Sequence, residues 1–490
     1  MSFPATGSTV DAVLARLAEL RAGDVPTHGG STMAYVYDSG LASLDGLAAA
    51  AQAQYQWTNA LDPTAFPSVA ALENDVVGAA ISLLGGGPDT VGTFTSGGTE
   101  SCLLAVLAAR ERFVAAGGSA RPRLVLPVTA HAAFRKAAHL FGLTVVDVPV
   151  DPVSCTVQQP DVADAMDSGG GEDTALVVVS APSYPHGTLD PVAAVAELAR
   201  SRGVACHVDA CIGGWVLPFL RLAGEDVPPF DLSVPGVSSL SVDLHKYGYT
   251  PKGASVLLTA DAELRRAHYF VTADWPGYPV VNPTLAGTRP AGPLAAAWAT
   301  LQVLGLDGYT RLAVDARRAT LDLAAGVADV PGLRVVGEPA GTLLAIAASP
   351  DPGGSDVLDV LVVADEMRAR GWVLQPQPAH GVLPPTVHLT LTAASLPLVS
   401  ALLADLAASA EVAARQPPAT PDPALVAAAH QVDVADLTPD VVLSLLELAG
   451  LGRDGSLPAR MAPVHALLGV LPTALAERLL AEIVGRIYRT

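Results

Sequence analysis

Short apolar runs alternate with amphipathic stretches through the central half of the chain. The runs at residues 91–95, 124–127, 144–148, 175–180, 204–209, 239–242 and 254–259 predict strands. Apolar residues at helical spacing predict helices between several of them, at 100–116, 132–141 and 191–201. Because strands that alternate with helices need crossover connections, we expect a mainly parallel mixed sheet sandwiched by helices.

The same patterns divide the chain into four parts. Residues 1–60 form an N-terminal helical arm, with helices predicted at 10–23 and 43–56, and residues 61–300 form a large α/β domain. Residues 301–415 repeat the pattern as a smaller α/β domain, with strands predicted at 333–336, 343–348, 372–375 and 387–392. The proline-rich run QPPATPDP opens the last part, 416–490, which continues as a helical extension rich in Ala and Leu.

Composition narrows the class of protein. Half of the 490 residues are hydrophobic and 16% are charged, which excludes a disordered polyelectrolyte. The formal net charge of −20 argues against nucleic acid or an anionic membrane as a partner. The apolar runs are too short to span a bilayer and the N-terminus shows no secretory signal, so we expect no stable membrane insertion and a cytoplasmic location. The four cysteines include no CxxC pair, so we expect neither a disulfide scaffold nor a zinc ribbon.

Two side chains at strand ends carry the most specific chemistry. Lys246, in SVDLHKYGYTPKG, stands just past a buried-looking strand. It is either an ordinary lysine at a strand end or one that condenses with an aldehyde, and in the second case we expect desolvation and neighbouring charge to lower its pKa. Asp209, in VACHVDACIGG, closes another strand, at the edge where open α/β sheets bind ligands. It is either a helix-capping aspartate or the partner of a protonated ring nitrogen, which pyridoxal 5′-phosphate (PLP) requires.

Two further elements agree with a PLP site. In TSGGTES, Gly97, Gly98 and Thr99 form a turn that opens into a helix, whose first N–H groups can hold a phosphate. His131 lies between an apolar segment and a helix, where it is either a core histidine or a residue that stacks on a pyridine ring. A metal site built on His207 and Asp209 lacks further ligands, so we expect none. The order of phosphate turn, histidine, aspartate and lysine, each at a strand terminus, favours a PLP enzyme.

At these residues the sequence resembles the group II PLP-dependent decarboxylase superfamily, and within it the sphingosine-phosphate lyases most closely. The similar stretches are TSGGTES, HAAFRKAAHLFG, SAPSYPHGTLDPV, CHVDACIGGWVLPF, SVDLHKYGYTPKG, TADWPGYPVVNPTLAGTRPAG and RGWVLQPQ, within about residues 28–395. The resemblance implies a PLP-dependent transferase-like fold (fold type I) and a homodimer with active sites at the subunit interface.

The resemblance also assigns roles by motif position. It makes Lys246 the lysine that binds the cofactor, Asp209 the partner of the pyridine nitrogen and His131 the stacking residue. Around the cofactor phosphate it implies Gly98, Thr99, Ser241 and His245, with Thr288 from the neighbouring subunit, and at the substrate end it implies Tyr37, Asn59 and Lys252.

The sequence departs from the family pattern in three places. Where family lyases have a histidine in a motif like NPLHPD, this chain has NALDPTAFP, so Asp62 stands where a substrate phosphate would be held. A carboxylate repels a phosphate, so either the substrate has lost the phosphate or Asp62 points elsewhere. The membrane helix of eukaryotic relatives is missing, and the extension after Pro423 lies outside the family core.

Three hypotheses follow for the function. The first is a carbon–carbon lyase that cleaves the Cα–Cβ bond of a small-molecule amine, an amino alcohol with or without a phosphate, to an aldehyde and an amine. Lys246, Lys252 or a tyrosine such as Tyr37 would move the protons. The second is α-decarboxylation of an amino acid on the same cofactor. The third is a binding or scaffold protein on an inactive PLP fold, against which the retention of both Lys246 and Asp209 argues.

Overall fold

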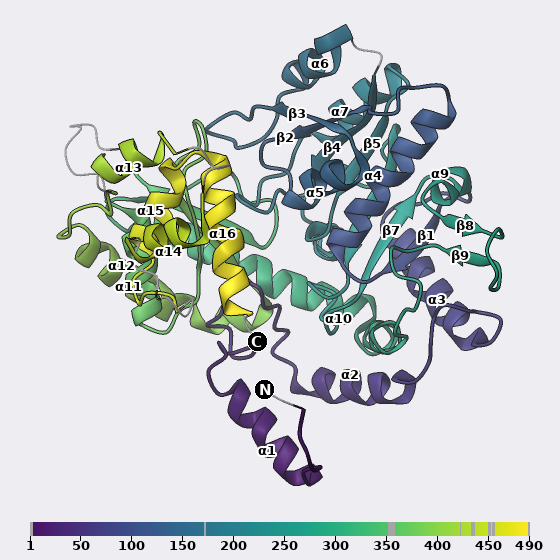
Figure 1. Cartoon of the computed structure of the whole chain (residues 1–490), viewed down its shortest axis with the longest axis horizontal. Helices are drawn as coiled ribbons and strands as arrows, with labels where there is room; N and C mark the ends of the chain where they lie inside the picture. The colour runs from purple at the N-terminus through teal and green to yellow at the C-terminus, as the bar shows by residue number, and fades with distance from the viewer. Residues whose placement is uncertain are drawn as a thin grey trace.

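Seven strands form the large sheet, in the order β1-β7-β6-β5-β4-β2-β3 (Figure 1). The computed structural model describes residues 3–170, 173–350, 358–421, 423–432, 437–448, 452 and 456–488. Within it, β7 is antiparallel to its neighbours β1 and β6, and the other neighbouring strands are parallel. The strands are β1 (Val91–Thr95), β2 (Arg123–Pro127), β3 (Thr144–Val148), β4 (Thr174–Ser180), β5 (Ala205–Asp209), β6 (Val237–Asp243) and β7 (Ser255–Thr259). All seven predicted strands are confirmed, with bounds that differ by at most two residues.

Helices cover both faces of this sheet because alternate strand residues point to opposite sides. Leu124, Leu126 and Leu176 pack with α4 (Gly98–Ala115) and α5 (Ala132–Phe141). Val125 and Val177 belong to the core on the other face. That face carries α3 (Pro67–Leu83), α6 (Gln159–Asp167), α7 (Val192–Ser201), α8 (Leu217–Leu222) and the first part of α10 (Gly292–Val327).

The smaller domain is built on a four-stranded sheet of order β10-β11-β13-β12, antiparallel throughout. Its strands are β10 (Leu333–Val335), β11 (Leu343–Ala348), β12 (Gln375–Gln377) and β13 (Thr386–Thr390), and α11 (Val360–Ala369) and α12 (Val399–Ala413) pack on it. The strand predicted at 372–375 begins at Gln375, because Val373 pairs with Thr32 of the N-terminal segment instead. The predicted boundary at residue 300 falls inside α10, which continues from the large core into the small one.

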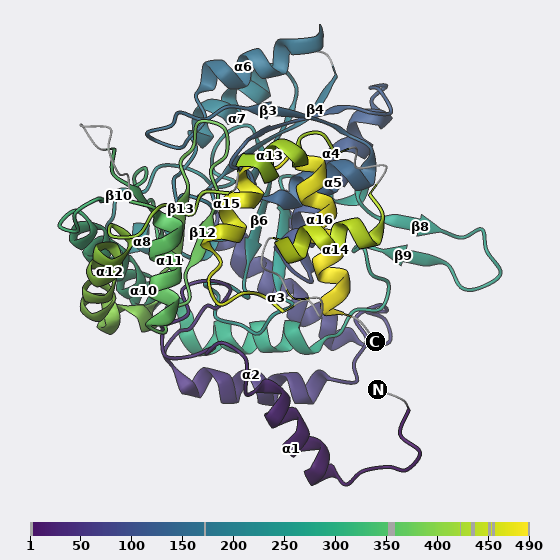
Figure 2. The same cartoon turned by 60° about the vertical axis from the view of Figure 1, so that its left-hand side comes forward.

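The two helices of the N-terminal arm differ in how they contact the rest of the chain. No residue of α1 (Val10–Arg21) is buried, whereas α2 (Ala42–Tyr55) packs along α10. Figure 2 shows that α1 stands away from the body, as does the hairpin of β8 (Phe270–Thr272) and β9 (Val280–Asn282). A short helix, α9 (Ala262–Ala267), precedes that hairpin.

The C-terminal extension is helical, as predicted, and has a small core of its own. Its helices are α13 (Pro423–Ala429), α14 (Pro439–Leu448), α15 (Ala462–Val470) and α16 (Thr473–Ile487). Residues 422, 433–436, 449–451, 453–455 and 489–490 of the predicted linker and extension lie outside the described residues. Across the described chain, the helical stretch Ala393–Ala413 alone has the length and apolar composition to cross a membrane, and its α12 part packs in the small-domain core.

Candidate active site

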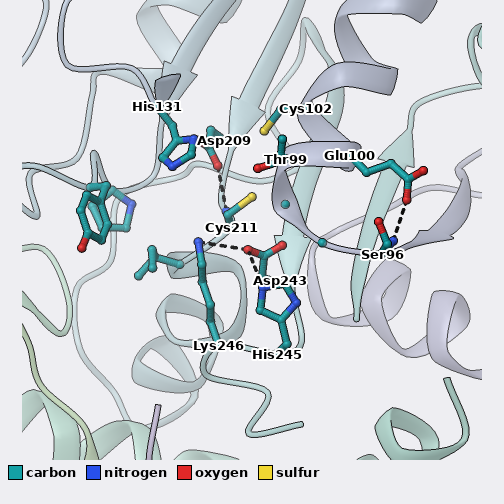
Figure 3. Close-up of a pocket in the computed structure, with 15 residues that line it drawn as sticks. Ser96, Thr99, Glu100, Cys102, His131, Asp209, Cys211, Asp243, His245 and Lys246 are labelled. Atoms are coloured by element: carbon teal, nitrogen blue, oxygen red, sulfur yellow. Dashed lines mark hydrogen bonds and ion pairs between the residues drawn. The ribbon is translucent and has the colours of Figure 1, made fainter. Parts of the chain in front are cut away.

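A cavity of about 320 Å³ lies where β5 and β6 end and α4 begins. This is the carboxyl edge of the parallel strands, where ligands bind in open α/β sheets. Figure 3 shows polar side chains converging on it from both strand ends and from the turn before α4. Its lining residues are Ser96, Gly97, Gly98, Thr99, Glu100, Cys102, His131, Pro182, Tyr184, Asp209, Cys211, Ile212, Asp243, His245 and Lys246.

Lys246 reaches this cavity from the connection between β6 and β7. β6 ends at Asp243, and the chain turns back immediately, which places Lys246 over the end of its own strand. The Nζ atom of Lys246 lies 3.0 Å from Oδ2 of Asp243, whose side chain is only 1% exposed (Figure 3). Nε2 of His245 lies 3.6 Å from the same oxygen.

The pKa of Lys246 differs from the value expected from the sequence. Burial lowers the pKa of Lys246, but the carboxylate of Asp243, with smaller contributions from Tyr37 and other groups, outweighs it and holds the pKa well above its usual value. The predicted lowering of the Lys246 pKa is therefore wrong. Asp243, three residues before the lysine, is a buried carboxylate that favours the charged amine. The lowered pKa belongs to Lys252, through desolvation of its amine and the nearby positive charge of Lys246.

Asp209 and His131 line the cavity from the ends of β5 and of the loop before α5. Asp209 is the last residue of β5, and its Oδ1 accepts hydrogen bonds from the backbone N–H of Cys211 (3.1 Å) and from the hydroxyl of Ser241 (3.4 Å). His131 precedes α5 and caps it, since its Nδ1 accepts from the N–H of Ala133 at 3.2 Å. Desolvation lowers the pKa of His131, so its imidazole is neutral at pH 7. The structure thus brings Lys246, Asp209 and His131 to one cavity.

The turn before α4 needs glycine. Gly97 has a φ of +157°, and a Cβ on Gly98 would lie 2.6 Å from one oxygen of Asp243 and 2.8 Å from the other. The turn is fixed by Glu100, whose carboxylate accepts from the N–H groups of Ser96 (2.7 Å) and Leu285 (2.9 Å). The first turn of α4 therefore approaches the cavity closely, with Gly97, Gly98 and Thr99 in its lining.

These residues fit PLP. The start of α4, with Gly97, Gly98 and Thr99 lining the cavity, is an anion site for the phosphate. Asp209 offers a carboxylate for the ring nitrogen, and the amine of Lys246 suits the aldehyde. Oδ1 of Asp243 is buried without a hydrogen-bond partner, and the cavity volume lies in the range of small-molecule sites.

Tyr37 and Lys252 form a pair beside this cavity. Nζ of Lys252 lies 4.9 Å from the ring centroid of Tyr37 and donates to the backbone oxygens of Tyr35 (3.2 Å) and His245 (3.4 Å). Burial raises the pKa of Tyr37, so its phenol keeps its proton. Neither side chain lines the cavity itself, yet both lie next to it.

Four other predicted site residues do not line the cavity, and one of them, Thr288, is expected at the site of the neighbouring subunit. Asn59 accepts from the N–H groups of Leu61 (3.0 Å) and Arg289 (3.3 Å), and Thr288 lines a separate hollow of about 90 Å³. Asp62 is exposed, and hydrogen bonds from Thr64 to its carboxylate lower its pKa. Ser241, expected at the phosphate, is fully buried behind Asp209, where its hydroxyl also contacts Nε2 of His207 at 3.2 Å. Both readings of Asp62, loss of the substrate phosphate or a side chain that points elsewhere, remain predictions.

Eight residues that line the cavity were not predicted from the sequence, and Asp243 and Tyr184 are the two with the clearest contacts. Asp243 stands in the SVDLHK motif itself, and a buried carboxylate at a strand end was an available signal. Tyr184 follows β4 and packs against His388 of the small domain, with ring centroids 4.3 Å apart and planes tilted by 33°. Its position depends on the packing of the large domain against the small one, which the local sequence around Tyr184 does not predict.

The cavity floor also holds two thiols. The ligand atoms of Cys102, Asp209 and Cys211 lie within 4.8 Å of one another, a group able to hold a metal by distance alone. The hydrogen bond with Cys102, burial and nearby carboxylates hold the pKa of Cys211 well above its usual value, and burial together with those carboxylates raises that of Cys102 despite its hydrogen bonds. Both thiols therefore keep their protons in this structure, and the expected lack of a metal site remains a prediction.

Known proteins resemble this chain over most of its length. Residues 3–330 match the family model described as the pyridoxal-dependent decarboxylase conserved domain. Sphingosine-1-phosphate lyase of Dictyostelium discoideum is 38% identical over 352 residues, which are 72% of this chain and 63% of that protein. Sphingosine-1-phosphate lyase 1 of Rattus norvegicus is 37% identical over 392 residues, 80% of this chain and 66% of that protein. The chain thus spans just under two thirds of the length of these relatives.

Solved structures agree with the fold. A sphingosine-1-phosphate lyase from Burkholderia pseudomallei superposes with a TM-score of 0.78 at 36% identity, covering 84% of this chain and 93% of that one. A glutamate decarboxylase from Lactobacillus brevis superposes with a TM-score of 0.72 at 18% identity, covering 85% and 96%, which shows the fold alone. Residues 423–486 match a second model, described as the "C-terminal putative HTH domain" of pyridoxal-dependent enzymes.

Proposed function

Because the chain belongs to the pyridoxal-dependent decarboxylase family and its cofactor is PLP, we propose that it is a carbon–carbon lyase. It cleaves the Cα–Cβ bond of an amino alcohol to an aldehyde and an amine. The observation that carries this proposal is the convergence of Lys246, Asp209 and His131 on one cavity at the sheet edge. The relatives named sphingosine-1-phosphate lyases, at 36–38% identity, support this bond as the one that breaks.

When bound, PLP supplies an electron sink for the bond that breaks at Cα. Asp209 would hold the ring nitrogen protonated, and the neutral imidazole of His131 would contact the ring. Lys246 would hold the cofactor through its aldehyde.

Lys252 and Tyr37 are suited to different proton transfers. Desolvation and the nearby charge of Lys246 lower the pKa of Lys252, which makes it the better suited of the two lysines to accept the proton of the β-hydroxyl group. Tyr37, whose pKa is raised, keeps a phenol proton that it can donate. The hydroxyl proton goes to Lys252, Cβ leaves as the aldehyde carbon, and Cα takes a proton from Tyr37. The proton on Lys252 then replaces the one that Tyr37 gave up, so no net proton is gained or lost.

We also propose that the protein is a homodimer and that it acts in the cytoplasm. The exposed apolar residues of α1 and of the β8–β9 hairpin support a partner subunit. All four cysteines are free and buried, which agrees with a reducing compartment.

The test is product identity. Purified protein loaded with PLP is incubated with amino alcohols, with and without a phosphate, and with aromatic and acidic amino acids, and mass spectrometry scores aldehyde against carbon dioxide. Aldehyde from an amino alcohol supports the lyase, and carbon dioxide from an amino acid without aldehyde would establish the decarboxylase instead.

Lys246→Ala is the matching variant. It should lose the visible cofactor absorbance and either product, because the tether is gone. Lys136→Ala, an exposed lysine on α5, should keep both. Turnover retained by Lys246→Ala would refute the assignment of the tether.

A further inference from the structure

Asp243 is a buried carboxylate shared by the reactive lysine and the phosphate turn. Its Oδ2 lies 3.0 Å from Nζ of Lys246 and 3.6 Å from Nε2 of His245, and its Oδ1 has no hydrogen-bond partner. Its side chain is 1% exposed and touches the first residue of α4, where a Cβ on Gly98 would collide with both of its oxygens. The cavity is therefore built around this carboxylate.

A buried carboxylate that loses its cation is strongly destabilising. His245 is a weak substitute for Lys246, since desolvation lowers the pKa of its imidazole. Burial raises the pKa of Asp243, but Lys246 and then His245 lower it by more. The negative charge of Asp243 is thus maintained chiefly by the nitrogen of Lys246.

Attachment of PLP need not break this pair. The ammonium of Lys246 and the cofactor aldehyde give a protonated C=N bond and one water molecule, so the positive charge stays on the same nitrogen. No oxidant or further proton is required. If the Lys246 nitrogen became neutral, the buried carboxylate of Asp243 would lose its positively charged partner.

We propose that Asp243 is a positioning residue that remains the counter-ion of the Lys246 nitrogen before and after cofactor attachment. It holds that nitrogen protonated and directed into the cavity. The proposal depends on the cofactor and not on the choice between lyase and decarboxylase chemistry, so it stands or falls separately from the proposed reaction.

Other groups also face this nitrogen, from several elements. Asp209 and Cys211 approach from β5 and the loop after it, Tyr37 from the N-terminal arm and Tyr184 from the loop after β4. His131 before α5, His245 in the same turn and Lys252 add neutral or positive neighbours. Among these groups Asp243 alone forms an ion pair with Lys246, so its removal should dominate.

The test is the pH titration of the visible cofactor band in the full-length, PLP-loaded protein. In Asp243→Asn the band pKa should fall by about one pH unit or more, a tenfold rise in the proton dissociation constant, because an opposite charge at this distance shifts a pKa by about 1–3 units. Asp243→Glu, which keeps the charge, should stay close to the parent protein. Asp261→Asn, which removes a carboxylate paired with Arg112 on the surface, should not change the titration.

Two results would overturn the proposal. One is a folded, PLP-loaded Asp243→Asn protein, checked by circular dichroism, whose band titrates as the parent does. The other needs no variant: a parent band that loses its proton below about pH 7 would show that Asp243 does not hold the nitrogen protonated. If Asp243→Asn does not fold, this second measurement decides.

Discussion

Gly98 is a residue at which one added methyl group should disturb the site. In Gly98→Ala the new Cβ would lie within 2.8 Å of both oxygens of Asp243 and of the Cys211 sulfur, so the start of α4 must move. We expect the PLP dissociation constant to rise about tenfold, which is ~1.4 kcal/mol. Equilibrium titration of the apoprotein with PLP measures this.

A matched control is Gly78→Ala in α3, where an added Cβ meets nothing within 4 Å. It should leave PLP affinity unchanged and raise the free energy of unfolding by about 0.5–1 kcal/mol. Equal PLP affinity in both variants would show that the turn does not depend on the contact of Gly98 with Asp243.

Four buried histidines make the fold less stable in acid. Burial lowers the pKa of His186, His207 and His268 to about 4 and that of His388 to about 3. The unfolded chain therefore binds more protons below pH 6.5, and the free energy of unfolding should fall between about pH 6.5 and 4, by ~1.4 kcal/mol per pH unit for each group. Urea unfolding at pH 7 and pH 5 checks the sign.

Asp190 acts in the opposite direction. Burial raises its pKa to about 6, so its protonation favours the folded state as the pH falls through 6 and offsets about one imidazole. His207→Gln, which removes one titrating group, should flatten the pH dependence. A midpoint that rises from pH 7 to pH 5 would contradict the buried neutral histidines.

The residues predicted correctly at the cavity are those with a local signal. Lys246, Asp209 and His131 each stand beside a predicted strand end or helix start. Because the carboxyl ends of parallel strands meet at one edge of the sheet, these positions predicted that the three side chains lie close together. Asn59 and Asp62 were assigned by motif position, which does not reveal that neighbouring backbone N–H groups occupy their side-chain oxygens. Their predicted contact with substrate remains a prediction.

At the scale of elements, apolar runs predicted the large sheet well because buried parallel strands have apolar residues on both faces. The helix α3 and the hairpin β8–β9 were not predicted. The hairpin strands are three residues long, and none of their residues is buried. Their sequence therefore shows no alternation of apolar and polar residues from which a strand could be predicted. The antiparallel direction of β7 and of the small sheet also could not be inferred, since alternation with helices speaks only for parallel pairs.

Polar and apolar contacts join the C-terminal helices to α11, among them an ion pair of Glu366 with Arg460 and hydrogen bonds to Asp365. The two carboxylate oxygens of Asp365 accept from the N–H groups of Met461 and Ala462 at 2.9 Å, where α15 begins. Asp365→Ala should cost about 1 kcal/mol of unfolding free energy and speed proteolysis of the linker at 414–421. Thermal unfolding and limited proteolysis measure the two effects.

Glu411→Ala is the control for this variant, because Glu411 forms an exposed pair with Arg415 on α12. It should change neither the melting temperature nor the cleavage rate. If Asp365→Ala matches it, the extension is held by its apolar contacts with the small domain and not by this cap.

At the scale of the molecule, α1 predicts a partner subunit. Val10, Leu14 and Leu17 lie along it and are 72%, 58% and 57% exposed. We expect light scattering after gel filtration to give the mass of a dimer. Leu14→Glu with Leu17→Glu should shift it toward the monomer, because charge in an apolar interface is costly.

Val314→Glu with Leu321→Glu is the control, since both side chains are exposed on α10. This protein should keep the mass of the parent. A parent protein that elutes as a monomer at micromolar concentration would contradict the proposed dimer.

The path of α10 through both cores restricts how relatives of this protein can differ in length. Leu312 and Ala313 pack in the large core, and Ala319 and Leu323 in the small one. One residue inserted between them would turn everything downstream by about 100° and point the second pair away from its core. Natural insertions and deletions should therefore gather in surface loops, and an ungapped stretch at 313–319 should mark this helix when related sequences are aligned.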